Sequence, residues 1–250
     1  MRAALFSLAA ALALSAPAAA RPATGMVEAA DYDAFWLWAG VAPQPVLARA
    51  RSLYLLRGQV SAPRNGTGPA RLTAQGGSTP HIRPRVAGAE VWIVYRAHTL
   101  DWPPGIYAHI LDDLGRWRAA GNPVVGVQID FDARTRHLDQ YAAFLKNLRA
   151  RLPAQDRLSI TGLLDWSSQG DPAALDALAG VVDEVVLQTY QGRRTIPGYE
   201  AYLARLGRLK VPFKIGLVEG GAWTPQRAVA ANPRFRGYVV FLKNPHTTSG

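Results

Sequence analysis

The sequence predicts an α/β protein, a small (β/α)8 barrel. Eight short apolar runs recur along the chain, and amphipathic stretches of helical period lie between most of them. Strands that alternate with helices form parallel sheets covered by helices, and eight strands can close into a barrel. A doubly wound open sheet is the alternative, but it normally carries a glycine-rich phosphate turn, and this sequence has none.

The predicted strands are short and nearly continuous in apolar character, as strands buried on both faces should be. β-Branched and aromatic residues are frequent in them, which suits a pleated, buried surface. In chain order we expect the strands at residues 34–39, 53–60, 91–97, 124–132, 158–164, 184–190, 213–218 and 238–242.

The clearest helical periods fall at residues 106–120, 138–152, 173–182 and 199–209. Gly121-Asn122-Pro123 ends the first helix, because glycine favours a helix C-terminus and proline cannot continue the helix. Asp171-Pro172 begins the third, with an N-cap residue followed by proline at the first helical position.

The regular alternation weakens in two places. Residues 61–89 are rich in glycine, proline and arginine without helical period, so we expect a long loop after strand two over one face of the barrel. Residues 224–231 allow only a short helix after strand seven. The chain stops soon after strand eight, so the last helix should be missing or reduced.

The amino-terminal residues 1–20 have the features of a secretory signal peptide. A positive start is followed by a short apolar run and by small residues at positions 18 and 20. No later segment resembles a membrane span. We therefore expect a secreted or periplasmic bacterial protein, with one barrel domain at residues 31–250 and no membrane association after signal cleavage.

The formal net charge is +10, and most of the positive charge is arginine scattered among the helical segments. Such scatter is typical of solvated helix faces, although a surface for a polyanion is the alternative. No nucleic-acid-binding motif accompanies it, so we expect no nucleic-acid partner.

The run Val-Val-Gly-Val-Gln-Ile-Asp-Phe-Asp at residues 124–132 is the most informative stretch. Gln128, Asp130 and Asp132 stand at spacing two, so all three side chains should point to the inner face of one strand. Buried carboxylates are unfavourable unless they are paired or reach a cavity. Two acids at the carboxyl end of a barrel strand therefore favour a glycosidase site. The alternative is an N-cap Asp beside an Asp that pairs with an arginine.

Polar and aromatic residues stand at the ends of the other strands too. Carboxylates can move protons, and flat aromatic rings stack on sugar rings. We expect one of Trp36 and Trp38 to be a packing residue. Besides Asp130, Asp132 and Glu219, the candidate site comprises the substrate-binding residues Gln128, Tyr190, Gln188, Asp165, Trp166, Trp38, His98, Arg96 and Trp223.

Residues 126–132, Gly-Val-Gln-Ile-Asp-Phe-Asp, resemble the fourth-strand motif of chitinase-type glycosidases, Gly-x-Asp-x-Asp-Trp-Glu. Gln188-Thr189-Tyr190 resembles their sixth-strand Met-Thr-Tyr. From about Asp31 onward, the chain is similar to an uncharacterised family of secreted bacterial proteins within the glycosidase barrel superfamily.

The resemblance implies that Asp132 is the general acid, that Asp130 tunes it, and that Tyr190 contacts the reacting sugar. This chain departs from the motif because Asp replaces Glu at position 132 and Gln replaces Asp at position 128. The shorter side chain at position 132 sets its carboxyl about 1 Å back, enough to lower the rate about 100-fold if uncorrected. These departures put substrate-assisted chemistry and an N-acetylated sugar in doubt.

A mechanism with two carboxylates remains open. Asp132 and Glu219 stand at the strand ends that many retaining barrel glycosidases use for acid and nucleophile, and Asp165 is the alternative second acid. Glu219 is otherwise a loop residue before a Gly-Gly turn, and Asp165 an Asx-turn residue.

The five histidines lack metal-ligand spacing, although His98 with Asp130 and Asp132 could hold a metal in a deacetylase-like site. We predict no metal, no cofactor and a monomer. The main hypothesis is a secreted glycoside hydrolase acting on a polysaccharide. The alternatives are a carbohydrate-binding barrel without catalysis and a cationic protein that binds an anionic envelope polymer.

Overall fold

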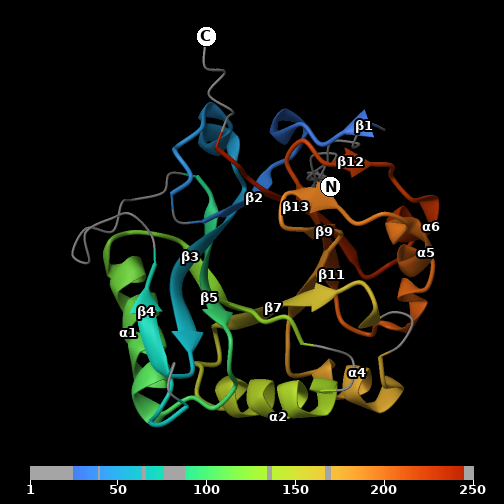
Figure 1. The fold of residues 1–250 in the computed structure, drawn as a ribbon. Helices are drawn as coiled ribbons and strands as arrows, with labels where there is room; N and C mark the ends of the chain where they lie inside the picture. The colour runs from blue at the N-terminus through green and yellow to red at the C-terminus, as the bar shows by residue number, and fades with distance from the viewer. Residues whose placement is uncertain are drawn as a thin grey trace, which may run out of the picture.

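The computed structural model describes residues 25–38, 40–63, 66–75, 88–133, 137–166 and 170–244. Within these residues, eight parallel strands form the central sheet (Figure 1). They are β2 (Ala34–Leu37), β3 (Ser52–Ser61), β5 (Glu90–Ala97), β6 (Val124–Asp130), β7 (Arg157–Leu163), β8 (Glu184–Gln188), β11 (Phe213–Val218) and β13 (Phe235–Phe241). All eight lie at the predicted positions.

The sheet closes on itself. β2 pairs in parallel with β3 on one side and with β13 on the other, so the first and last strands of the barrel are hydrogen-bonded neighbours. The other parallel pairs follow the chain order without a crossover. The predicted (β/α)8 class is therefore confirmed, and the open doubly wound sheet is excluded.

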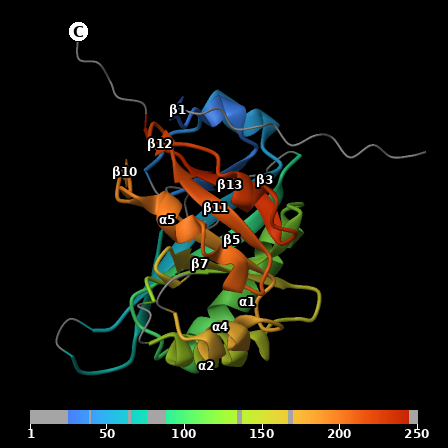
Figure 2. The same cartoon turned by 90° about the vertical axis from the view of Figure 1, so that its right-hand side faces the viewer.

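The helices lie outside the ring of strands (Figure 1), and Figure 2 shows the same barrel from the side. The predicted helices are present, with the third and fourth shorter than expected. Their bounds are α1 (Pro104–Ala119), α2 (Leu138–Arg149), α4 (Pro172–Leu178), α5 (Tyr199–Leu203) and α6 (Arg227–Ala230), with 3-10 turns η1 (Ala29–Asp31), η2 (Pro45–Arg49) and η4 (Leu206–Arg208).

The predicted start of the third helix agrees with its capping. Asp171 accepts a hydrogen bond from the Ala173 N–H, as an N-cap residue should. α6 is the short helix expected after strand seven. In the described chain beyond β13, residues 242–244, no helix follows. None of the helices in the described ranges combines the length and apolar character needed to cross a bilayer.

The segment 61–89, predicted as a loop, contains one strand that its composition did not reveal. β4 (Arg71–Ala74) pairs antiparallel with the carboxyl half of β3, from Gly58 to Ser61. The exposed pattern of β4 lacks the apolar character of a barrel strand, which is why periodicity missed it. Residues 64–65 and 76–87 lie outside the described ranges.

A second small pairing lies before the predicted domain start at residue 31. β1 (Gly25–Met26) pairs antiparallel with β12 (Ala222–Trp223). The Val27 N–H also donates to the Gly221 carbonyl oxygen at 2.8 Å. The described chain is thus joined to the loop after β11 from residue 25 onward. The predicted signal peptide lies outside the described residues.

Two hydrophobic clusters stabilise the barrel, one between the strands and the helices and a smaller one inside the ring. Inside the ring, the Tyr54 and Trp92 rings stack with centroids 5.7 Å apart, and Trp36 meets Tyr54 edge-on at 5.9 Å. Gly216 makes room for Trp36, since a Cβ at position 216 would lie 2.8 Å from two of its ring atoms. Bulky aromatics therefore fill the interior together with the branched aliphatics that are usual in barrels.

Polar side chains close the amino-terminal end of the barrel. The Lys214 ammonium lies 3.1 Å from the Glu184 carboxylate and donates to the Tyr54 hydroxyl at 2.8 Å. Tyr54 and Ser159 both donate to Glu184 Oε1. The buried carboxylate is therefore paired and hydrogen-bonded, as burial of a charge requires.

Candidate active site at the carboxyl end of the barrel

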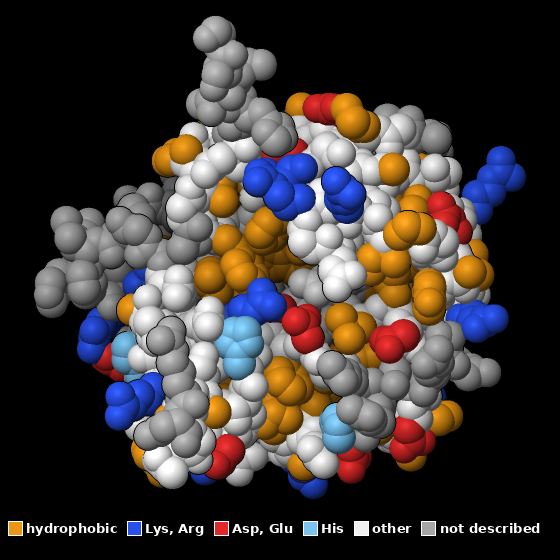
Figure 3. All heavy atoms as spheres, in the orientation of Figure 1, with side chains coloured by type: hydrophobic (Ala, Val, Ile, Leu, Met, Phe, Trp, Pro, Cys, Tyr) orange, Lys and Arg blue, Asp and Glu red, His pale blue; other side chains and the backbone are white. Residues whose placement is uncertain are grey.

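A pocket of about 620 Å³ opens at the carboxyl ends of the strands. The ends of β2, β5, β6, β7, β8 and β13 all contribute to it. In the orientation of Figure 1 the surface is hollowed near its middle, with hydrophobic side chains inside and charged side chains at the edge (Figure 3). The lining residues are Trp38, Arg96, Asp132, Leu163, Leu164, Asp165, Gln188, Tyr190, Gln191, Gly192, Ile196, Tyr202 and Phe241.

The inner face of β6 carries the polar residues that the sequence predicted. The Gln128 side chain is fully buried, accepts a hydrogen bond from Trp36 Nε1 at 2.6 Å and donates to Ser159 Oγ at 2.9 Å. An amide meets both demands because it carries an acceptor and a donor, whereas a carboxylate could not donate to Ser159. Val127 and Ile129 face the cluster between strands and helices, as expected.

Asp130 ends β6 and is buried, with 3% of its surface exposed. Thr161 Oγ1 donates to its Oδ1 at 2.9 Å, and Arg96 Nη1 lies 3.6 Å from its Oδ2. Burial raises the pKa of the Asp130 carboxyl to about 6; Arg96 and the Thr161 hydrogen bond lower it, and the nearby charge of Asp132 raises it. Near neutral pH this carboxyl therefore titrates.

Asp132 lies two residues beyond the end of β6, so the strand is shorter than predicted. Its side chain still lines the pocket, while Phe131 packs against the outer cluster, so the alternation of faces continues past the strand. The Asp132 side chain is 61% exposed, and its Oδ2 accepts a hydrogen bond from Arg96 Nη2 at 3.3 Å. The candidate acid therefore lies at the mouth of the pocket.

Arg96, at the end of β5, connects the two acids of β6. One guanidinium nitrogen faces Asp130 and another faces Asp132. The guanidinium also lies over the Trp38 ring, 5.2 Å from its centroid. These contacts from three sides fix the arginine, and through it they fix the Asp132 carboxylate relative to the aromatic wall.

Trp36 and Trp38 both point into the barrel, since residues two apart on a strand share a face. Trp36 is the packing residue of the pair, buried in the interior and bonded to Gln128. Trp38 lines the pocket and meets Phe241 edge-on at 5.5 Å.

Tyr190 and Gln188 line the same pocket as Asp132. The Tyr190 ring lies 6.3 Å from Trp36 and 5.7 Å from Phe241, so it joins the interior aromatics to the pocket wall. Burial raises the pKa of the Tyr190 hydroxyl well above its usual value, and the charge of Asp130 raises it further; a hydrogen bond with Gln188 lowers it. The hydroxyl is therefore a neutral donor at physiological pH.

Asp165 is the second carboxylate of the pocket lining. Burial raises its pKa, while hydrogen bonds with its own backbone and that of Trp166 lower it. Trp166 itself is buried and donates from Nε1 to the Ala133 carbonyl oxygen at 2.9 Å. It belongs to the core and does not line the pocket.

Three other predicted site residues are not brought to this pocket. Glu219 Oε2 accepts a hydrogen bond from the Lys243 N–H at 2.9 Å and so fixes the chain after β13. Trp223 is buried and stacks on Tyr199 with centroids 5.0 Å apart. The His98 side chain is exposed, and the backbone N–H of His98 donates to the Val60 carbonyl oxygen.

The pocket also contains residues that the sequence analysis missed. Gln191 and Gly192 belong to a hairpin between β9 (Tyr190–Gln191) and β10 (Arg194–Thr195). Gly192 has φ of 59°, a conformation that favours glycine, and Gly followed by two arginines is the signal that could have marked this turn. In the described ranges, no group of three or more His, Asp or Glu side chains is placed to hold a metal ion.

Part of the sequence matches a family model, and the structure is similar to solved barrel structures. Residues 92–211 match the model of a domain of unknown function, DUF3142. No curated protein matches the sequence. The structure is similar to the chitinase domain of the spore coat protein CotE from Clostridium difficile, with 13% sequence identity and a TM-score of 0.50 over 76% of this chain and 67% of that chain.

A second solved structure, the Bacillus cereus spore cortex-lytic enzyme SleL, has 18% identity and a TM-score of 0.48, with 74% of this chain and 49% of that chain covered. This chain thus spans about half of that enzyme. At 13% identity, the likeness to the chitinase domain concerns the fold alone. The chain therefore has a closed eight-stranded parallel barrel, similar in fold to that chitinase domain, and its residues 92–211 match a domain of unknown function.

Proposed function

We propose that the protein is a secreted glycoside hydrolase that cleaves a polysaccharide at the carboxyl end of the barrel, with Asp132 as the general acid. The observation that carries the proposal is the pairing of Arg96 with both Asp130 and Asp132 beside the pocket. Acids at the carboxyl ends of barrel strands, next to aromatic rings of a pocket wall, are suited to glycosidic bond cleavage.

In this mechanism the Asp132 carboxyl donates its proton to the glycosidic oxygen as the bond to the anomeric carbon breaks. Asp130, behind Asp132 and bound to Arg96, tunes the acid: below about pH 6 it is protonated and its charge no longer acts on Asp132. Tyr190 and Gln188 donate hydrogen bonds to the sugar, and Trp38 offers an aromatic face.

The second carboxylate is Asp165 in this proposal, because it lines the same pocket whereas Glu219 does not. Asp165 acts as nucleophile if the reaction retains the anomeric configuration, and as base for a water molecule if it inverts. Retention requires carboxyls about 5–5.5 Å apart and inversion roughly 6.5–9.5 Å. NMR of the first-formed anomer distinguishes the two outcomes.

The test is release of reducing ends from a panel of cell-wall and extracellular polysaccharides and chitin oligosaccharides. Asp132→Asn should lower the rate by at least about 100-fold, since it cannot donate the proton. Asp139→Asn is the matched control, because Asp139 is an exposed residue of α2 outside the pocket. A wild-type rate in Asp132→Asn, or no cleavage of any polymer by the wild type, refutes the proposal.

The second candidate is a barrel that binds carbohydrate without cleaving it. It is favoured by the shorter Asp at position 132 and by the contact with Arg96 that already occupies its Oδ2. Unchanged polymer binding without cleavage, in wild type and Asp132→Asn alike, supports this candidate. If instead the protein binds an anionic envelope polymer through its net charge of +10, the affinity falls steeply as the salt concentration rises. The affinity is then the same in wild type and in Asp132→Asn.

A further inference from the structure

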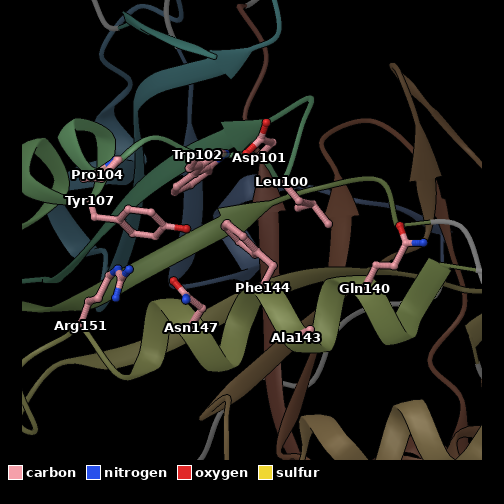
Figure 4. A pocket seen from close by; sticks show the side chains of 10 residues that line it. All are labelled: Leu100, Asp101, Trp102, Pro104, Tyr107, Gln140, Ala143, Phe144, Asn147 and Arg151. Carbon is pink, nitrogen blue, oxygen red and sulfur yellow. The ribbon is translucent and has the colours of Figure 1, made fainter. Parts of the chain in front are cut away.

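A second concave site lies on the outer wall of the barrel, outside the ring of strands. It is a groove of about 430 Å³ between the loop after β5, the first turns of α1, and α2 (Figure 4). None of its residues lines the carboxyl-end pocket. The groove is lined by Leu100, Asp101, Trp102, Pro104, Tyr107, Gln140, Ala143, Phe144, Asn147 and Arg151.

The floor of the groove is a preformed set of three aromatic rings. Trp102 meets Phe144 edge-on at 4.8 Å and lies 5.6 Å from Tyr107. Trp102 Nε1 donates to the Thr99 carbonyl oxygen at 2.8 Å, and Pro103 and Pro104 follow it with restricted backbone. The rings are therefore fixed before any ligand arrives, which reduces the entropic cost of binding.

The rim of the groove carries polar groups with free hydrogen-bonding capacity. Gln140 and Asn147 are exposed, and neither side chain hydrogen-bonds to another residue in the described ranges. Figure 4 shows the Tyr107 ring and the Asn147 amide directed toward one another across the groove. The Arg151 guanidinium lies 4.8 Å from the Tyr107 ring centroid and forms one wall.

The charges of the rim balance. Asp101 and Arg151 contribute one charge of each sign, and the other lining residues are uncharged. This balance disfavours an acidic or basic polymer. Trp102, Tyr107 and Phe144 are buried, with 6%, 8% and 7% of their surfaces exposed, so a ligand would meet mainly the amides and the guanidinium of the rim. These groups supply donors and acceptors within one concavity, which suits a ligand rich in hydroxyl groups.

We propose that this groove is a second carbohydrate-binding site, which holds a segment of a neutral glycan chain outside the catalytic pocket. The groove and the pocket are only a few residues apart in the sequence. The same β5 strand and its following loop carry Arg96 into the pocket and Leu100 to Trp102 into the groove. Polymer held at the groove keeps the enzyme on the surface of an insoluble substrate.

The experiment compares two double variants of α2. Gln140→Ala with Asn147→Ala removes both rim amides, whereas Asp139→Ala with Lys146→Ala changes the preceding exposed residues, keeps the net charge and leaves the groove lining intact. Retention is measured on the neutral polymers chitin and cellulose and, as an acidic comparison, on peptidoglycan glycan strands stripped of peptide. The rim variant should bind at least about fivefold more weakly, since two hydrogen-bonding groups are lost, and the control should match wild type.

Cleavage of a short soluble substrate should be unchanged in the rim variant, which separates this site from the carboxyl-end pocket; if the protein cleaves nothing, the retention assay still decides. Equal retention of the two double variants refutes the proposal, as does failure of the wild type to bind any of the three polymers. A loss seen on intact peptidoglycan but not on stripped strands assigns the groove to a peptide and also refutes it. Matched melting temperatures of the two variants exclude unfolding as the cause.

Discussion

Arg96 Nη1 lies 3.6 Å from Asp130 Oδ2, and this buried oxygen has no hydrogen-bond partner in the described part of the protein. The ion pair is therefore the main stabilisation of one half of a carboxylate whose other half is bonded to Thr161. The ionisation of Asp130 should therefore depend on Arg96. A ligand that displaces the Arg96 guanidinium should change the pKa of Asp130.

Replacing Arg96 by Met removes this cation while keeping a long side chain against Trp38. The pKa of Asp130 should rise further above about 6, by roughly one unit, because burial then acts without its largest opposing charge. The chemical shift of the side-chain carboxyl carbon of labelled Asp130, followed from pH 4 to pH 9, measures this pKa. Arg116→Met, which removes an exposed arginine of α1, should leave the Asp130 titration unchanged.

Asp130→Asn should change how stability depends on pH. The pKa of Asp130 is about 6 in the folded protein against 3.8 ordinarily, so the folded state binds more protons between about pH 4 and pH 6. The stability contribution of Asp130 therefore decreases as pH rises through this window. Relative to wild type, the variant should gain about 2.4 kcal/mol in the free energy of unfolding between pH 4 and pH 7.5.

Urea unfolding at several pH values measures this difference. The Asn Oδ1 can still accept the Thr161 hydrogen bond, so the comparison isolates the charge. Asp139→Asn, at an exposed site, should give a difference that does not vary with pH. A stability difference for Asp130→Asn that also does not vary with pH would show that burial does not raise the pKa of the Asp130 carboxyl.

Two glycine-to-alanine substitutions should have opposite signs. A Cβ at Gly126 would lie 1.9 Å from the Arg157 carbonyl oxygen, a backbone atom of the paired strand, so Gly126→Ala should destabilise by roughly 4 kcal/mol or more. A Cβ at Gly115, on the exposed face of α1, meets nothing within 4 Å, and Gly115→Ala should stabilise by about 0.5–1 kcal/mol. Thermal unfolding of the pair tests this, and a tolerated Gly126→Ala would mean that β6 and β7 can separate.

Tyr190→Phe should reduce turnover or sugar binding and leave the melting temperature nearly unchanged, because the ring contacts remain and one pocket hydroxyl is lost. Tyr199→Phe is the opposite case: the Tyr199 hydroxyl accepts the Thr224 N–H at 2.6 Å outside the pocket, so its loss should lower stability by about 1 kcal/mol without affecting sugar binding. A large loss of stability in Tyr190→Phe with binding intact would make Tyr190 a structural residue.

The sequence predicted what depends on periodicity. The eight strands and the inward side of Gln128 and Asp130 follow from the two-residue repeat of a buried strand. The repeat still places Asp132, two residues beyond the end of β6, but it does not fix the direction of side chains farther into the loops. Trp166 and Trp223 were therefore assigned to the site although both are packed in the core.

Pairings between distant segments left no signal in either segment alone. β4 is mostly exposed and short, and β1 has only two residues, so neither carries a period that local pattern could detect. The Arg96 bridge between two acids likewise depends on the register of β5 against β6, which sets Arg96 beside Asp130 and is not encoded in either strand alone.

The position of β2 between β3 and β13 sets the order in which the protein can fold. Residues 34–37 have one partner strand nearby in the chain and another about 200 residues later, at 235–241. Until that last strand arrives, the first barrel strand has an open hydrogen-bonding edge, able to pair with another chain. During synthesis, this edge should be the part of the molecule that most needs a chaperone.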